Sequence, residues 1–358
     1  MNILSPSCLA MLLLLPVPTY AQQPASALSH RVTTVAGAAR QPGSSDGTGR
    51  AARFNRPTGI AVATDGAVYI ADTDNHTIRR ITPLGAVTTL AGTAGSKGHL
   101  DGQGTAARFN RPVGLAIDAS GTLYVADGEN HIIRKITLAG SVTTLAGKAG
   151  RKGSTNGQGD EARFNYPHAL AVDTKGIVYV ADTESHTIRC ITAAGVVTTL
   201  AGAAGQKGAI DGENAMARFS HPSGIAVDSA GIVYVAENGT HTIRKITPAG
   251  HVATLAGMAG QNGAADGTGA AARFDTPNGI AADARGTMYV ADYVSSTIRR
   301  ITPAGEVTTI AGSVRGWGSQ DGVGKEARFN LPFGVAVGAG GRVVYVTDTQ
   351  NGLIRCIQ

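Results

Sequence analysis

Short apolar stretches separated by polar turns run along most of this chain, and their order returns at a fixed interval. The interval is 55 residues, as the spacing of one phenylalanine shows: Phe54, Phe109, Phe164, Phe219, Phe274 and Phe329. Each closes an Ala-Arg-Phe triplet and is followed by a proline and an apolar run such as Gly59-Ile60-Ala61-Val62. Because self-similarity at one period is the signature of a repeat architecture, we expect six copies of one unit, starting near residues 53, 108, 163, 218, 273 and 328.

Four short β-strands are predicted within each copy, at positions that we call A, B, C and D. In the first copy they cover residues 59–62, 68–72, 77–81 and 87–92. The second of these stretches, Val-Tyr-Ile-Ala-Asp, alternates and is rich in residues that favour strands. A glycine-bearing turn, Asp65-Gly66, joins A to B, and a turn containing Asn75-His76 joins B to C. Four such strands joined by tight turns make one blade of a β-propeller.

The two ends of the chain predict how the ring of blades closes. The sixth copy stops at Gln358, after its C strand, and the missing D strand is matched by Val32-Thr33-Thr34-Val35-Ala36-Gly37 near the N-terminus. Pairing this strand with the last blade would cover an open sheet edge. We therefore expect an all-β fold, a six-bladed β-propeller of four-stranded antiparallel blades, formed by residues 31–358 as one domain and closed by the N-terminal strand.

The motif that carries the repeat resembles a known family. Phe-x-x-Pro-x-Gly-Ile-Ala-Val is followed by Val-Tyr-Val-Ala-Asp and then by Asn-His-Thr-Ile-Arg. This order is similar to that of the NHL-repeat family, named for its Asn-His-Leu turn, which appears here as Asn75-His76 and Asn130-His131. The resemblance covers the chain from about residue 31 to residue 358 and implies the same propeller. It does not imply one activity, because this fold serves many functions.

The N-terminal stretch predicts export. It carries no charge, is apolar from Cys8 to Val17, and ends in Thr19-Tyr20-Ala21, a pattern suited to signal peptidase. We expect a signal peptide over residues 1–21 with cleavage near Ala21, a short linker over 22–30, and a secreted protein, periplasmic or extracellular. The apolar stretch is too short to span a membrane as a helix, so no transmembrane segment is expected after its removal.

Composition adds little to this picture but agrees with it. The 49 glycines and the charged share of 16% suit short strands and tight turns better than amphipathic helices. The net charge of +6 favours anionic partners, although simple solubility explains it equally well. Cys190 and Cys356 occupy the same position in the third and sixth copies, on opposite sides of a ring, so both are expected to be free thiols.

Residues that return in every copy are interpreted as building the blade. One such arginine precedes each phenylalanine: Arg53, Arg108, Arg163, Arg218, Arg273 and Arg328. A second arginine in strand C faces a carboxylate at the end of strand B, and ion pairs or turn hydrogen bonds are expected between them. The arginines are Arg79, Arg134, Arg189, Arg244, Arg299 and Arg355, and the carboxylates are Asp72, Asp127, Asp182, Glu237, Asp292 and Asp348. His76, His131, His186 and His241 share one turn and are interpreted as stabilising it, because they lie too far apart for one metal ion.

Residues that differ between copies are the candidates for function, and the first group flanks the repeating proline at the channel mouth. From the positions before the proline we select Arg56, Arg111, Tyr166 and His221, and from those after it His168, Asn278 and Phe333. Cationic, aromatic and apolar arcs are typical of an asymmetric ligand pocket. Neutral variation at a solvent-filled mouth is the alternative.

The second candidate group lies in the long D–A loop, which is expected on the same face as the histidine-bearing turn. It comprises Lys97, Arg151, Lys152, Lys207, Arg315 and Trp317. A basic rim with one indole suits a polyanion or a stacked sugar or base. A solvated set of loops is the alternative.

Two classes of propeller enzyme resemble this chain in the expected fold. Peptide-amidating lyases of this fold place zinc-binding histidines after the strand A proline in three blades, and here His168 alone matches. Gluconolactonase-like propellers hold calcium in the channel, and among the mouth residues Asn278 alone is a suitable ligand. We therefore expect a binding module, with no catalytic residue, metal or cofactor assigned, acting as a monomer on an anionic ligand, glycan or protein. Nucleic acid is disfavoured for an exported chain. A propeller enzyme with a channel metal is the alternative.

Overall fold

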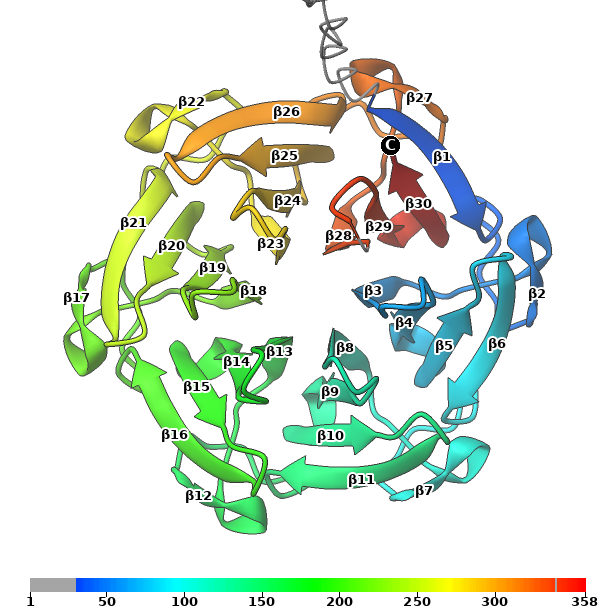
Figure 1. Ribbon diagram of the computed structural model, residues 1–358, viewed down its shortest axis with the longest axis horizontal. Coiled ribbons are helices and arrows are strands. Elements are labelled where there is room, and N and C mark those ends of the chain that lie inside the picture. Colours follow the sequence, from blue (N-terminus) through cyan, green and yellow to red (C-terminus); the bar gives the residue numbers. More distant parts are fainter. Residues whose placement is uncertain (1–29, 339) are drawn as a thin grey trace, which may run out of the picture.

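Six β-sheets are arranged around a central axis in the computed structural model, which describes residues 30–338 and 340–358. Figure 1 shows the ring from one face, with one strand of each sheet nearest the centre. These innermost A strands number the blades from 1 to 6. They are β3 (Pro57–Val62), β8 (Pro112–Ile117), β13 (Pro167–Val172), β18 (Pro222–Val227), β23 (Pro277–Ala282) and β28 (Pro332–Val337). The six-bladed propeller predicted from the repeat is confirmed.

The remaining strands of each blade follow outward in antiparallel order. The B strands are β4 (Val68–Asp72), β9 (Leu123–Asp127), β14 (Val178–Asp182), β19 (Val233–Glu237), β24 (Met288–Asp292) and β29 (Val344–Asp348). The C strands are β5 (Thr77–Ile81), β10 (Ile132–Ile136), β15 (Thr187–Ile191), β20 (Thr242–Ile246), β25 (Thr297–Ile301) and β30 (Leu353–Ile357). The D strands are β6 (Ala86–Ala91), β11 (Ser141–Ala146), β16 (Val196–Ala201), β21 (His251–Gly257), β26 (Glu306–Gly312) and β1 (Arg31–Ala36).

Each blade has five strands, so the prediction of four was wrong by one outer strand. The additional strands have two residues each: β2 (Gly47–Thr48), β7 (Gly102–Gln103), β12 (Gly157–Gln158), β17 (Gly212–Glu213), β22 (Gly267–Thr268) and β27 (Gly322–Val323). The D–A loop runs over the outside of the blade, where Gly47 pairs with Val87 and Thr48 with Ala86. This pairing covers part of the exposed edge of strand D. A strand of two residues is too short to show an alternation of apolar and polar positions, so the sequence did not reveal these outer strands.

Short 3₁₀ turns complete the blades. One set follows the outer strands: η1 (Gly49–Ala51), η3 (Gly104–Ala106), η5 (Gly159–Glu161), η7 (Asn214–Met216), η8 (Gly269–Ala271) and η9 (Gly324–Glu326). The other set forms B–C turns: η2 (Thr73–Asn75), η4 (Gly128–Asn130), η6 (Thr183–Ser185) and η10 (Thr349–Asn351). Within the described residues no helix is long and apolar enough to cross a membrane.

The ring closes as predicted, with the first strand paired to the last. Strand β1 lies beside β30, with Thr33 opposite Cys356, and also beside β27. The backbone N–H of Arg31 donates to the carbonyl of Gln358 at 2.9 Å. Figure 1 shows the two ends of the colour scale side by side in blade 6. Cys190 and Cys356 are free and lie in opposite blades, as expected.

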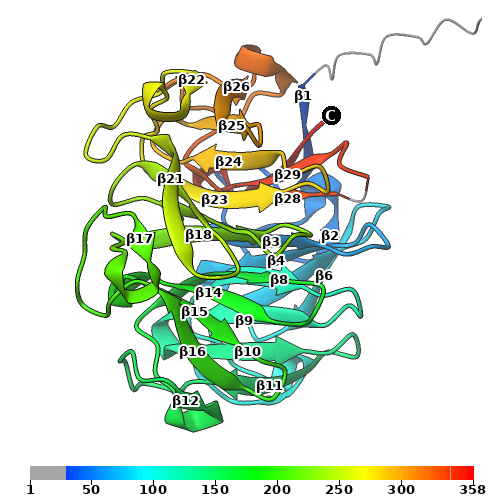
Figure 2. The same cartoon turned by 60° about the vertical axis from the view of Figure 1, so that its left-hand side comes forward.

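The apolar core lies between neighbouring blades rather than within one. Phe109 is fully buried and shares its cluster with Tyr69 and Ile78 of blade 1 and with Val125 of blade 2. Equivalent clusters around the other five phenylalanines repeat this arrangement around the ring. Figure 2 shows the faces of successive sheets stacked against one another in this way. Each blade is therefore stabilised by its two neighbours, as expected of a repeat protein.

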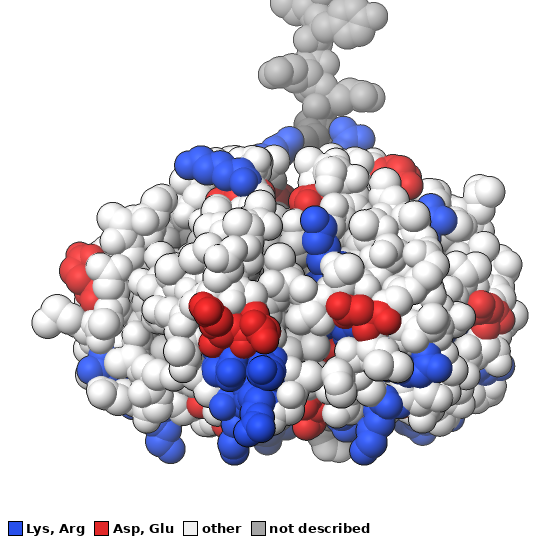
Figure 3. Space-filling model, turned by 90° about the horizontal axis from the view of Figure 1, so that it is seen from below, with Lys and Arg blue, Asp and Glu red and all other residues white. Residues whose placement is uncertain are grey.

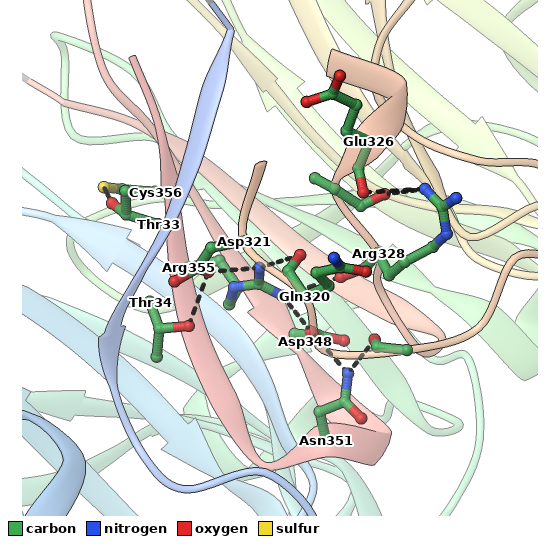
Figure 4. A network of polar contacts seen from close by, with 12 residues as sticks. Thr33, Thr34, Gln320, Asp321, Glu326, Arg328, Asp348, Asn351, Arg355 and Cys356 are labelled. Carbon is green, nitrogen blue, oxygen red and sulfur yellow. Dashed lines mark hydrogen bonds and ion pairs between the residues drawn. The ribbon is translucent and has the colours of Figure 1, made fainter. Parts of the chain in front are cut away.

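A fully buried arginine joins the D–A loop to each blade. In blade 6, Arg355 donates to the Asp348 carboxylate at 2.8 Å, to the Gln320 carbonyl at 3.1 Å and to Asp321 at 2.7 Å, as Figure 4 shows. Its guanidinium also lies over the Phe329 ring, 5.1 Å from the centroid. The same ion pair recurs in blades 1 to 5, which confirms the prediction that the strand C arginines pair with the strand B carboxylates.

Replacing one of these arginines should destabilise the whole propeller. We expect Arg134→Met to cost about 3–5 kcal/mol, because it leaves the Asp127 carboxylate buried without its partner. Lys135→Met, one residue along the same strand and partly exposed, is the matched control. Chemical unfolding of both variants checks the expectation, and an equal loss in the two would contradict it.

Candidate functional site

One face of the ring gathers the predicted site residues, and we call it the turn face. Pro57, at the start of strand A, pairs with Asp72 at the end of strand B, so the B–C turn lies beside the strand A entrance. The D–A loop joins them, because the N–H of Gly95 donates to the carbonyl of Asn75. The expectation that loop and turn share one face is thus met in the geometry.

The residue before each strand A proline has left-handed backbone geometry, with φ between +50° and +63°. These residues are Arg56, Arg111, Tyr166, His221, Thr276 and Leu331. Residues other than glycine rarely adopt a positive φ. A residue that precedes proline also favours extended backbone geometry over helical geometry. Because the strain recurs in every blade, it belongs to the construction of the blade rather than to one site.

The turn histidines fasten one blade to the next. The backbone N–H of Arg111 in blade 2 donates to Nδ1 of His76 in blade 1 at 3.0 Å. The same bond joins Tyr166 to His131, His221 to His186 and Thr276 to His241. We call this bond the histidine latch. Ser296 and Gly352 occupy the position in blades 5 and 6, so four of the six interfaces are latched. The four histidines, which we expected to stabilise their own turns, therefore also stabilise the interfaces between blades.

Four rings form a continuous row across the channel mouth, which we call the aromatic bridge. Tyr166 and His168 of blade 3 lie 6.0 Å apart, and His168 lies 5.1 Å from Phe333 of blade 6. Tyr293 of blade 5 contacts Phe333 edge-on at 6.0 Å. Blades 3 and 6 face one another across the ring, as β13 and β28 show in Figure 1. His168 is buried, whereas the other three rings are partly exposed on the turn face.

Below the bridge the channel is narrow. Its cavity measures about 50 Å³ and is lined by strand A residues of all six blades. In five of the six blades a glycine follows the residue after the proline, and blade 3 has Ala169 instead. The glycines permit this close packing, because a Cβ on Gly59 or Gly224 would overlap the backbone of the next blade. A water needs about 10–15 Å³, so the cavity can hold a few waters and no sugar or peptide. Asn278 lines it, and its buried Oδ1 has no partner among the described residues.

The cationic arc of the mouth is partly neutralised. Asp74 lies between the two predicted arginines, 3.7 Å from Nε of Arg56 and 3.3 Å from Nη2 of Arg111. The matching turn residues in blades 2 and 3 are also acidic, Glu129 and Glu184. In blades 4, 5 and 6 they are Gly239, Val294 and Gln350. One half of the mouth is thus mixed in charge and the other half is uncharged.

The predicted mouth residues therefore fall into separate groups. Tyr166, His168 and Phe333 meet in the aromatic bridge, and Arg56 and Arg111 share Asp74. His221 instead stacks edge-on against His186 at 4.8 Å, and Asn278 lies within the channel. Sequence reasoning missed Tyr293 and Asp74, although both occupy turn positions that vary from blade to blade and the same comparison would have found them.

Burial shifts the pKa values of two titratable side chains in the mouth, those of His168 and Tyr166. Burial lowers the pKa of His168, whose Nδ1 lies 2.7 Å from the carbonyl of Ser223, so the neutral ring with a proton on Nδ1 fits this contact. Burial also raises the pKa of Tyr166, although Arg111 and Arg56 oppose the shift. At neutral pH both side chains are uncharged, and the bridge presents a neutral surface.

All six predicted rim residues are exposed around the turn face: Lys97, Arg151, Lys152, Lys207, Arg315 and Trp317. Burial lowers the pKa of the latch histidines His76, His131 and His186, and the charges of Lys97, Lys152 and Lys207 add to this shift, so these lysines lie beside the turns. Figure 3 shows basic and acidic side chains at the edge of the disc in small groups separated by uncharged surface. No contact gathers the six residues into a single site among the described parts of the chain.

The residues at the mouth do not fit a channel metal of either enzymatic type. Nδ1 of His168 is held by the Ser223 carbonyl, and no second histidine occupies its position in another blade. In the described part of the chain, no three His, Cys, Asp or Glu side chains are grouped to hold a metal ion. Calcium would need several oxygen ligands, and Asn278 is the single amide at that level.

Comparison with known proteins agrees with the repeat. The family model described as NHL repeat matches residues 54–81, 109–136, 164–191 and 219–246. NHL repeat-containing protein 2 of Bos taurus is 29% identical over 326 residues, which cover 81% of this chain and 44% of that protein. SUPPRESSOR OF QUENCHING 1, chloroplastic, of Arabidopsis thaliana is 32% identical over 319 residues, covering 84% of this chain and 30% of that protein. This chain spans less than half the length of either relative.

Solved structures show the same fold. An auxiliary nutrient binding protein from Bacteroides thetaiotaomicron matches with a TM-score of 0.69 and 17% identity, over 91% of this chain and 76% of that chain. The gluconolactonase XC5397 from Xanthomonas campestris matches with a TM-score of 0.58 and 14% identity, over 92% and 91% of the two chains. At these identities the likeness concerns the fold alone.

The histidine latch should stabilise the ring in a pH-dependent way. Burial lowers the pKa of His131 below its ordinary value of 6.5, so the folded state favours the neutral, accepting imidazole. The latch is therefore present above about pH 6.5 and is lost as the pH falls. His131→Ala should cost about 0.5–1.5 kcal/mol near pH 8, and this difference from wild type should shrink toward about pH 5.

Unfolding curves at several pH values measure this difference, with exposed His99→Ala as the control. A cost for His131→Ala that does not change between these pH values would show that the imidazole does not act as a hydrogen-bond acceptor.

Proposed function

This chain is a member of the NHL-repeat family folded as a six-bladed propeller, and on that premise we propose that it is an exported protein that binds a glycan at its channel mouth. The aromatic bridge is the observation that carries the proposal. Partly exposed rings that are flat, rigid and neutral offer an apolar surface for the faces of sugar rings, at a low entropy cost for the protein.

Polar groups beside the bridge suit a hydroxyl-bearing ligand. The hydroxyl groups of Tyr166 and Tyr293 have no hydrogen-bond partner among the described residues, so they are available to a ligand. Arg56 and Arg111 lie at the adjoining arc with their guanidinium groups partly exposed. Together with the net charge of +6, these arginines favour a glycan that carries acidic groups.

The narrow channel supports binding at the mouth rather than within the ring. A cavity of about 50 Å³ is far below the roughly 300–1,000 Å³ of small-molecule pockets. A solved propeller of this fold is described as an auxiliary nutrient binding protein, which shows that the architecture occurs in a binding protein. The described residues at the mouth do not include three side chains grouped to bind a metal ion, and this argues against the lactonase and lyase alternatives.

Removing the central ring of the bridge tests the proposal. Phe333→Ala should weaken binding of acidic oligosaccharides, such as oligogalacturonate, at least tenfold, equivalent to about 1.4 kcal/mol. Leu84→Ala is the matched control, since Leu84 is 91% exposed in a C–D turn at the other end of the blade. Titration calorimetry on the two variants measures the change. If Trp317→Ala weakens binding and Phe333→Ala does not, the loop rim and not the mouth is the site.

Export is part of the proposal, and the predicted signal peptide and the linker up to residue 29 lie outside the described residues. Expression of the full chain in a bacterial host should yield a periplasmic or secreted product whose first residue is Gln22. N-terminal sequencing of that product reads the cleavage site. A product that stays in the cytoplasm with residues 1–21 attached would contradict export, and the glycan test would then need an intracellular ligand.

A further inference from the structure

A larger pocket lies between blades 6 and 1, away from the channel, and we call it the seam pocket. Its volume is about 200 Å³, compared with about 50 Å³ for the channel. It is lined by the D–A loop of blade 1, the segment before strand β3 and the turn η10 of blade 6. These residues are Arg40, Gln41, Pro42, Phe54, Asn55, Arg56, Thr349, Gln350, Asn351 and Gly352.

The seam pocket lies where the histidine latch is missing. At four interfaces an imidazole accepts the backbone N–H of the residue before the strand A proline. At this interface the latch position is Gly352, which has no side chain, so the N–H of Arg56 has no imidazole to bind. A Cβ on Gly352 would lie 3.2 Å from the Phe54 carbonyl oxygen, which is close but leaves the position open to a histidine.

An arginine faces the empty latch position from the neighbouring loop. The first loop position that contacts the B–C turn is glycine in four blades, namely Gly95, Gly150, Gly205 and Gly260. At the two interfaces without a latch it is Arg315 and Arg40, with φ of +55° and +59°. At this loop position, arginine in left-handed geometry therefore occurs only at the interfaces without the histidine, and the two substitutions occur together.

The two arginines differ in one respect that points to a ligand. Arg315 lies 3.6 Å from the Asp275 carboxylate of blade 5. The position equivalent to Asp275 in blade 6 is Asn330, so Arg40 lacks that carboxylate, and no other described residue forms an ion pair with it. None of the residues lining the seam pocket is acidic. The Arg56 guanidinium is shared with Asp74, so among the described residues that line the pocket Arg40 is the arginine without an ion pair, and no lining residue supplies an anion.

A buried acceptor completes the chemistry of the pocket. Asn351 is fully buried, and its Nδ2 donates to the Asp348 carboxylate and to the Gly318 carbonyl. These bonds orient the amide, and its Oδ1 has no partner among the described residues. A buried acceptor without a donor is unfavourable, so a ligand that supplies a hydroxyl or amino group would stabilise it.

We propose that the seam pocket binds a small carboxylate that also carries a hydrogen-bond donor, such as a uronic acid or a hydroxy acid. The carboxylate would accept from the Arg56 N–H, where an imidazole nitrogen accepts in the latched interfaces, and would pair with Arg40. A hydroxyl group would donate to Oδ1 of Asn351. A cavity of about 150 Å³ holds benzene, so about 200 Å³ accommodates a six-membered sugar ring. The inference does not depend on glycan binding at the mouth.

Filling the pocket with the missing side chain is the direct test. Titration calorimetry on the exported chain with D-glucuronate should give saturable binding, with D-glucose and inorganic phosphate at least tenfold weaker. Gly352→His and Arg40→Gly each restore the residue found in four other blades, and each should weaken glucuronate binding at least tenfold. Ser296→His adds the same latch at the interface between blades 5 and 6 and should leave the affinity unchanged. The melting temperature of each variant confirms that the ring is intact.

Three results would overturn the proposal. They are no glucuronate binding by the wild type, unchanged affinity in a folded Gly352→His variant, and phosphate binding as tight as that of glucuronate, which would indicate an unselective oxyanion site. Phe333→Ala separates this inference from the proposed function, because it should leave glucuronate binding at the seam pocket intact. A loss in that variant would place the carboxylate at the mouth instead.

Discussion

The buried arginine of strand C is the constraint on which the rest of this propeller depends. Each guanidinium is removed from water, paired with a carboxylate and bonded to carbonyl groups of the long D–A loop. A buried ion pair is weak evidence for stability by itself. Here, however, the same donors satisfy loop carbonyls that would otherwise be buried without partners. The arginine therefore decides where the loop lies, and the loop in turn shapes the turn face on which both proposed sites are found.

Much of this structure could be predicted from the sequence, because the fold rests on local and repeated signals. The alternation in residues 68–72 defined strand B, and the match between residues 32–37 and 87–92 predicted the ring closure later seen between β1 and β30. The outer two-residue strands could not be predicted, since their pairing leaves no periodic pattern. Left-handed geometry before a proline was also beyond prediction, because the intrinsic preference of that position is opposed by the packing of the blade.

The candidate site was predicted in part, and the reason lies in the ring. Comparing blades found Tyr166 and Phe333 as variable residues, but only the closed ring brings blades 3 and 6 face to face so that His168 joins the two rings. Asp74 was not predicted, because it comes from the B–C turn, two strands further along the chain than Arg56, and the fold alone brings it beside Arg56 and Arg111. Contacts across a ring depend on the curvature of the whole assembly, and no single repeat encodes that curvature.

Close packing of the A strands accounts for why both proposed sites lie on the turn face and not on the channel axis. Glycine beside the channel lets neighbouring backbones approach until about 50 Å³ remains, so enlarging the channel would require separating the blades that stabilise one another. Variation at the ends of strands carries no such cost, because those residues contact solvent on one side. At the interface between blades 6 and 1, where Gly352 takes the place of the latch histidine, the cavity has about 200 Å³, four times the volume of the channel cavity of about 50 Å³. A repeat that is uniform in its core thus allows each interface to differ, and the departures from the repeat are where we propose sites.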